Sequence, residues 1–222
     1  DKRVREALDY AINKQEIISK ILQGYAKPAG DILPPTMDLD DPSRQPWPYD
    51  PEKAKKLLAE AGYPNGFDAG ELLDWFSSND MMLMIKDYWE KVGVKSKVVK
   101  LEDGAALAKT YTKEAGIHYF LDRDSMLDGS AFVIRRYHPQ GQHHYIDVPE
   151  WGKQIDDALA IRDPQKRTQA MNEFLRKAEG ETHHVINLYH AQVNFGVRDR
   201  VEWDTLPGWA YLGRFQFMRV TD

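Results

Sequence analysis

The stretch from Tyr49 to Phe67, YDPEKAKKLLAEAGYPNGF, carries the signals for one complete helix and for both of its ends. The pair Asp50-Pro51 is typical of a helix start, because aspartate accepts hydrogen bonds from the first backbone N–H groups and proline has no N–H to leave unpaired. Gly62 favours the left-handed backbone that closes a helix, and Pro64 prevents its continuation. The sequence therefore predicts a helix with defined ends here.

One face of this helix is apolar and the opposite face is charged. The apolar positions are Ala54, Leu57, Leu58 and Ala61. A helix with this pattern buries one side against a larger body and leaves the other in water. We therefore expect a globular protein with this helix at its surface.

Composition excludes several classes of protein. The 222 residues are 42% hydrophobic and 29% charged, which is ordinary for a soluble globular chain. The net charge of −5 is spread along the sequence, which argues against a nucleic-acid partner. No apolar run approaches the roughly 20 residues that span a bilayer. The absence of cysteine excludes disulfides and thiol chemistry.

Helical periodicity marks the start of the chain, and a proline-rich segment follows it. Apolar spacing predicts a helix pair that breaks at Asn13-Lys14 and stops at Gly24. Residues 27–50 contain six of the twelve prolines, so we expect an irregular loop that lines a site or covers a surface. Because the chain begins inside a helical pattern without a start methionine, we expect it to be part of a longer protein.

Strands and helices alternate in the middle of the chain. We predict strands over 71–76, 94–101 and 116–121, separated by helices over 79–93 and 101–115. This order favours an α/β layer with parallel strands joined by right-handed crossovers.

Residues 122–149 are predicted to be a charged turn, a brief apolar stretch at 131–134 and a histidine-rich loop. Helices over 150–161 and 164–179 follow, the second with an Asp163-Pro164 start. Strands are expected over 185–189 and 192–197.

Polar and aromatic side chains follow two of the predicted strands. Open α/β sheets bind ligands at the carboxyl ends of their strands. An aspartate there can hold an ammonium group and an arginine a carboxylate, which suits a zwitterionic ligand. The expected ligand-binding residues are Trp75, Ser77, Asn79, Tyr119, Asp122, Arg123, Asp124 and Ser125. The alternative reading of the acidic group is a solvated turn.

The sequence contains no signature of a metal enzyme or of a nucleophilic one. His143-His144 and His183-His184 are adjacent pairs whose rings point in different directions, so no metal or other cofactor is expected. His118 is interpreted as a core or wall residue. Phe120, Phe132 and Phe174 are expected in the core, whereas tryptophans at 47, 203 and 209 are expected to face a missing partner lobe.

Three segments resemble the bacterial extracellular solute-binding proteins of family 5. DKRVREALDYAINK is similar to that family's D-x-x-V-R-x-A-L-x-Y-A-I-D-R pattern, with Asn13-Lys14 in place of Asp-Arg. YDPEKAKKLLAEAGYPNGF resembles its most regular stretch, and residues 149–178 resemble its late helices. Members of the family are about twice as long as this chain.

The resemblance implies the second lobe of a class II periplasmic-binding-protein fold over residues 1–198, with a mixed sheet flanked by helices. Residues 199–222 would return to the missing first lobe. It also implies a non-enzymatic, monomeric, periplasmic component of an ABC importer. Such a protein would bind a peptide or similar small polar solute by hinge closure and would then be recognised by permease subunits. Asp122 or Asp124 would hold the amino terminus of a peptide.

The sequence is also compatible with two other functions. One is a small hydrolase that uses Asp122 and Asp124, or His118, in a cleft. It predicts a closed pocket with an acid pair, whereas a binding lobe predicts a half-open wall without turnover. The other is a folding or interaction module with no ligand affinity of its own.

Overall fold

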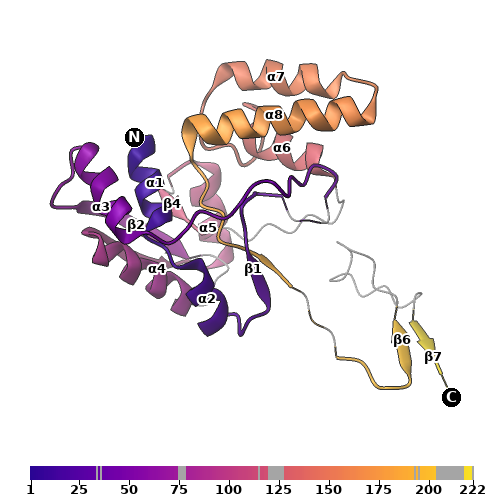
Figure 1. Ribbon diagram of the computed structural model, residues 1–222, viewed down its shortest axis with the longest axis horizontal. Coiled ribbons are helices and arrows are strands. Elements are labelled where there is room, and N and C mark those ends of the chain that lie inside the picture. Colours follow the sequence, from indigo (N-terminus) through magenta and orange to yellow (C-terminus); the bar gives the residue numbers. More distant parts are fainter. Residues whose placement is uncertain are drawn as a thin grey trace.

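The computed structural model describes residues 1–33, 35, 37–74, 79–114, 116–119, 128–192, 194, 196–203 and 218–221. Figure 1 shows an α/β layer, a layer of helices beside it and a tail that leads away from both. The helices are α1 (Lys2–Tyr10), α2 (Lys14–Lys20), α3 (Pro51–Glu60), α4 (Asn79–Lys91), α5 (Asp103–Tyr111), α6 (Gly129–Tyr137), α7 (Pro149–Leu159) and α8 (Pro164–Thr182). The strands are β1 (Ala26–Pro28), β2 (Phe67–Asp74), β3 (Val94–Lys100), β4 (Ile117–His118), β5 (Tyr189–Ala191), β6 (Val201–Trp203) and β7 (Met218–Val220).

The main sheet has β2 at its centre, with β3 on one side and β4 on the other. Both pairings are parallel, as the strand–helix–strand order predicts. Helices α1, α3 and α4 contribute to a hydrophobic cluster with this sheet, in which Leu58, Trp89 and Val94 are almost completely buried. We call this the sheet cluster. It establishes the α/β layer expected from the sequence.

The start and end of α3 follow the local signals in the sequence. The Asp50 carboxylate accepts a hydrogen bond from the backbone N–H of Lys53 at 2.9 Å, and Pro51 is the first helical residue. Beyond the helix, Gly66 adopts a φ of +76°, and a Cβ there would lie 1.8 Å from the carbonyl oxygen of Gly93. Only glycine fits at such a close approach of two backbones. This contact sets where β2 begins beside β3.

A second hydrophobic cluster lies between α6, α7, α8 and part of the proline-rich loop. We call it the helical cluster, and Figure 1 shows its three helices side by side. Phe132, Trp151 and Phe174 are buried in it, so the core placement predicted for the two phenylalanines is confirmed. Phe120 lies outside the described residues.

Helix α6 contradicts the prediction of a turn and loop over residues 122–149. The Asp128 carboxylate caps the helix by accepting hydrogen bonds from the backbone N–H groups of Ser130 and Ala131. Phe132, Val133 and Tyr137 then form a buried stripe. Arg136 is buried as well, with its guanidinium 5.6 Å from the centre of the Phe132 ring. Because a basic residue lies on the buried face, the sequence does not show the apolar spacing that is typical of a helix.

The proline-rich loop covers the helical layer, as its composition predicts. Leu33, Met37 and Leu39 are buried in the helical cluster. Arg44 forms ion pairs with Asp31 at 3.0 Å and with Glu179 of α8 at 3.1 Å. A buried charge is tolerated only with such partners. The loop is therefore attached by both apolar contacts and ion pairs.

A buried polar group joins the two layers. The Asp9 carboxylate of α1 contacts the Lys14 Nζ at 2.7 Å and the His183 Nε2, just after α8, at 3.1 Å. The indole of Trp47 packs against the rings of Tyr10 and His183. Trp47 was expected to face a missing lobe. It packs instead in the joint between two layers of this chain.

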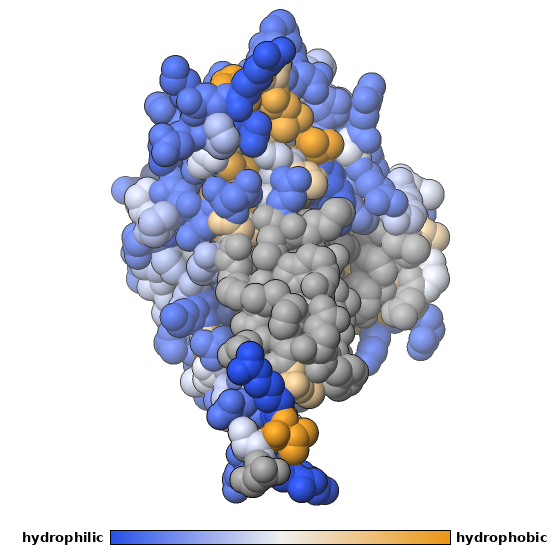
Figure 2. All heavy atoms as spheres, turned by 90° about the vertical axis from the view of Figure 1, so that its right-hand side faces the viewer, coloured by the Kyte–Doolittle hydropathy of each residue, from blue (hydrophilic) through white to orange (hydrophobic). Residues whose placement is uncertain are grey.

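A two-stranded ribbon of β1 and β5 lies where the last part of the chain leaves the α/β layer. β5 pairs antiparallel with β1. It shares only Tyr189 with the two strands predicted over 185–189 and 192–197, so for the other described residues those predictions are wrong. β1 was not predicted within the proline-rich region. Beyond β5, Figure 1 shows the hairpin of β6 and β7 standing apart from both layers. Apolar surface is visible at the hairpin in Figure 2, and Val220 is 72% exposed. Trp203 is the last residue of β6 and Trp209 lies outside the described residues, so the expectation for these two stays a prediction.

Replacing Ala54 by Asp is expected to lower the free energy of unfolding by about 3–5 kcal/mol, because it buries an unpaired charge in the sheet cluster. The matched control is Ala59→Asp, the same change on the exposed side of α3, for which we expect less than about 1 kcal/mol. Urea unfolding measures both. Equal losses in the two variants would contradict the assigned orientation of α3.

Candidate ligand-binding wall

The two predicted groups of ligand-binding residues follow neighbouring parallel strands. Leu72 and Leu73 of β2 pair with Ile117 and His118 of β4. The backbone N–H of Tyr119 donates to the carbonyl of Leu73 at 3.0 Å, which holds the ends of the two strands together. Carboxyl ends of parallel strands lie at one edge of the sheet. We call this edge the ligand wall, because the predicted ligand-binding residues follow its strands in the sequence.

Tyr119 is the predicted site residue that the structure describes in full. Its side chain is 8% exposed, and its hydroxyl lies 2.6 Å from the hydroxyl of Tyr189 in β5. Asn79 is the first residue of α4. Trp75, Ser77 and the four residues Asp122, Arg123, Asp124 and Ser125 lie outside the described residues. The structure thus brings the strand ends together, and the roles of these side chains stay predictions.

Two polar residues at this edge were not among the predicted site residues. Asp74, the last residue of β2, is fully buried, and Tyr189 is brought to the wall by β5. An aspartate at the end of the apolar run Leu72-Leu73 is a local signal that could have been used. The position of Tyr189 depends on a pairing with a strand about 160 residues earlier, which no local pattern reveals.

His118 forms part of the wall in its neutral form. Burial lowers the pKa of its imidazole to about 4, and the positive charge of Arg136 adds to this effect. Its ring packs against that of Tyr145, with centroids 4.7 Å apart. This partly buried environment agrees with the interpretation of His118 as a core or wall residue. A neutral imidazole contributes hydrogen bonding and contact area, and no fixed charge.

The histidine pairs have divergent surroundings, as their adjacency predicts. The His143 ring stacks on Tyr111, whereas His144 contacts Lys113 and Asp147. His183 contacts Asp9 in the joint between the layers. Within the described part of the chain, no three His, Cys, Asp or Glu side chains are grouped so as to hold a metal ion.

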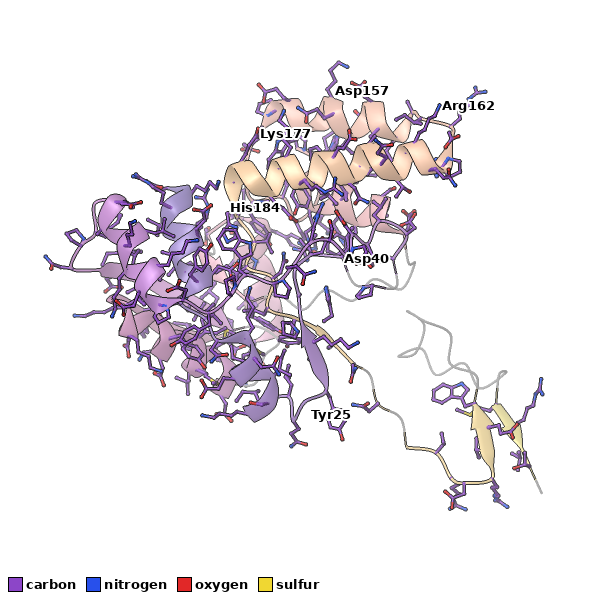
Figure 3. The ribbon with its side chains drawn as sticks, viewed as in Figure 1. Tyr25, Asp40, Asp157, Arg162, Lys177 and His184 are labelled. Carbon is purple, nitrogen blue, oxygen red and sulfur yellow. The ribbon has the colours of Figure 1, made fainter. Side chains whose placement is uncertain are left out.

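His184 lies apart from the ligand wall. Its Nδ1 is 2.8 Å from the Thr182 hydroxyl, and its ring meets those of Tyr137 and Trp151 in the helical layer. Figure 3 shows it at the end of α8, where the chain turns toward the sheet. Burial lowers its pKa to about 4.

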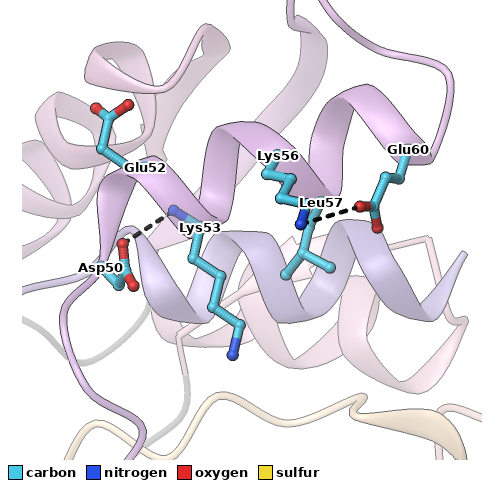
Figure 4. A pocket seen from close by; sticks show the side chains of 6 residues that line it. All are labelled: Asp50, Glu52, Lys53, Lys56, Leu57 and Glu60. Atoms are coloured by element: carbon cyan, nitrogen blue, oxygen red, sulfur yellow. Dashed lines mark hydrogen bonds and ion pairs between the residues drawn. The ribbon is translucent and has the colours of Figure 1, made fainter.

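A surface pocket of about 420 Å³ lies along α3, and none of its lining residues belongs to β2 or β4 (Figure 4). Its lining is almost entirely charged: Asp50, Glu52, Lys53, Lys56, Leu57 and Glu60. Lys53 Nζ donates to the hydroxyl of Tyr10, and Lys56 pairs with Glu60 at 4.0 Å. The charged side chains of this lining already have polar partners, and an open groove on one helix offers little enclosure for a ligand. We assign no binding to it.

Comparison with solved structures identifies the fold. The chain superposes over its whole length on the periplasmic binding protein DppA from Helicobacter pylori in complex with the peptide STSA, with a TM-score of 0.81 at 20% identity, and covers 44% of that chain. It also matches a dipeptide binding protein from Pseudoalteromonas sp. SM9913 in complex with Met-Leu, with a TM-score of 0.80 at 22% identity, and covers 45% of it. The fold is thus that of one part of a periplasmic binding protein.

Sequence comparison identifies the family. Residues 1–144 match the model of the bacterial extracellular solute-binding proteins, family 5 Middle, and the chain belongs to this family. The glutathione-binding protein GsiB of Salmonella typhimurium is 33% identical over 187 residues, which are 77% of this chain and 36% of GsiB. The chain therefore spans about a third of the length of this relative. No described helix is long and apolar enough to cross a membrane.

Acid is expected to destabilise the fold through His118 and His184. Both imidazoles stay neutral in the folded state down to about pH 4, whereas in the unfolded chain they take up protons below about pH 6.5. The unfolded state therefore binds more protons between these values, and stability falls as the pH drops from 6.5 to 4, on the order of 1–3 kcal/mol per residue. Ring ¹⁵N chemical shifts measure the imidazole charge directly. Midpoints near pH 6.5 in the folded protein would contradict this assignment.

Proposed function

We propose that this chain is the second lobe of the substrate-binding component of an ABC importer, which binds a peptide or similar small polar solute between two lobes. The observation that carries the proposal is the whole-chain match to binding proteins whose structures contain STSA or Met-Leu, combined with membership of family 5. The glutathione-binding relative also has a peptide as its solute. The alternative hydrolase has no support from these relatives.

The wall suits the backbone and termini of a short peptide. The end of β4 carries the neutral imidazole of His118 and, one residue later, Tyr119, whose hydroxyl contacts that of Tyr189 in the separate β1–β5 ribbon. In the proposal, Asp122 or Asp124 accepts hydrogen bonds from the ammonium terminus, and Arg123 attracts negative charge on the ligand. Trp75, Ser77, Asn79 and Ser125 complete the contacts from the neighbouring segments.

Closure of the two lobes around the solute is the proposed mechanism. One lobe alone makes only part of the contacts with the solute. High affinity therefore requires the closed form, in which both lobes contact the solute. Permease subunits in the membrane then recognise that form. The protein acts in the periplasm as a monomer, catalyses no reaction and needs no cofactor.

The hairpin of β6 and β7 is proposed to belong with the first lobe. Figure 1 shows it apart from both layers, and the exposed Val220 of β7 provides apolar surface for a partner. This supports a division in which residues 1–198 form the second lobe and residues 199–222 pack on the first.

Isothermal titration calorimetry on the full-length protein tests the proposal with three probes: glutathione, Met-Leu and STSA. We expect binding of at least one probe without its hydrolysis. Asp122→Ala or Asp124→Ala is expected to weaken that binding about 10- to 100-fold, because a charge-assisted hydrogen bond to the ammonium group is lost.

The matched control is Asp157→Ala. Asp157 lies on α7, its side chain is 64% exposed, and Figure 3 shows it on the outer side of the helical layer. This variant is expected to bind like the wild type. Unchanged affinity in both wall variants would exclude the assigned aspartate role. Failure of all three probes to bind, or their cleavage, would contradict the proposed function.

A further inference from the structure

The hydroxyl contact between Tyr119 and Tyr189 links two parts of the chain that no regular pairing joins. Tyr119 follows β4 at the ligand wall, and Tyr189 begins β5, 70 residues later. The two oxygens are 2.6 Å apart, a short hydrogen bond in which either group can donate. The main sheet and the ribbon of β1 and β5 are separate sheets, so this bond crosses between them.

Tyr189 can hold the side chain of Tyr119 in place because its own backbone is fixed by strand pairing. It pairs with Pro28 of β1, and Ile186, Leu188 and Tyr189 pack against the sheet cluster. The backbone N–H of Gln192 donates to the carbonyl of Tyr25. From there the chain leads to the hairpin of β6 and β7, which stands apart from the body (Figure 1). Tyr189 therefore lies near the point where the chain leaves the α/β layer.

Tyr119 is held at the wall by a second, different bond. Its backbone N–H donates to Leu73 of β2, and its ring is buried in the sheet cluster. Removing one hydrogen-bond partner of a buried hydroxyl costs free energy, because the protein bond is lost and water does not replace it. Loss of the Tyr189 hydroxyl should therefore disturb Tyr119 and the strand end on which it lies.

We propose that Tyr189 is a positioning residue, whose hydroxyl fixes Tyr119 and thereby ties the ligand wall to the segment through which the chain leaves this lobe. The effect on ligand affinity rests on the proposed function. The tie itself is a property of the unliganded fold. Tyr189 need not touch the solute to influence how tightly the solute is held.

Amide hydrogen exchange in the unliganded full-length protein tests the tie. Tyr189→Phe removes the hydroxyl and keeps the ring, and we expect about fivefold faster exchange at the Tyr119 amide. The control is Tyr88→Phe, which removes a hydroxyl that donates to Glu16 on α2. This variant also loses a tyrosine hydrogen bond, at another place in the sheet cluster, and amide exchange at Tyr119 should stay unchanged. Unchanged exchange in Tyr189→Phe would overturn the proposal.

Calorimetry with glutathione and Met-Leu then tests the effect on affinity. We expect about fivefold weaker binding for Tyr189→Phe, and no further loss when Tyr189→Phe is added to Tyr119→Phe, because the bond between the two hydroxyls is already broken there. Additive losses, or an equal loss in Tyr88→Phe, would overturn the role in positioning. If exchange responds as expected and the wild type binds neither probe nor STSA, the tie stands and the proposed function fails.

Discussion

The backbone of β2 hydrogen-bonds to β3 on one side and to β4 on the other, and the position of the ligand wall follows from these two pairings. The close approach of Gly66 to Gly93 sets where β2 begins, and the bond from Tyr119 to Leu73 sets where β4 ends beside it. Because side chains alternate along a strand, a shift of one residue would exchange its two faces. The register of β2 against β3 shifts between Asp68 and Glu71, so the pairs from Glu71–Lys97 to Asp74–Lys100 fix which groups reach the edge.

The rest of the chain holds this sheet in a defined relation to the helical layer. The two hydrophobic clusters are separate, and the group of Asp9, Lys14 and His183 joins them together with the ring of Trp47. A buried carboxylate with two partners is directional in a way that apolar contact is not. Arg5 adds a forked hydrogen bond to the carbonyl of Thr182 at the end of α8. The joint therefore depends on polar geometry more than on buried area.

The sequence was most informative where the physical signals are local. Asp50-Pro51 and the apolar face of α3 predicted that helix, and the order of strands predicted the parallel sheet. The ligand-binding role of its carboxyl edge stays a prediction. Helix α6 escaped prediction because Arg136 lies on its buried face with its guanidinium over Phe132. Trp47 was misplaced because its partners, Tyr10 and His183, are distant in sequence. Tyr189 was missed for the same reason.

A solute bound against the carboxyl edge of β2 and β4 would be visible in a crystal structure of the full-length protein with whichever of glutathione, Met-Leu and STSA it binds. We expect ligand atoms within hydrogen-bonding distance of the segments 75–79 and 119–125, enclosed on the other side by the first lobe. A ligand held in the α3 pocket, or by the first lobe alone, would contradict it.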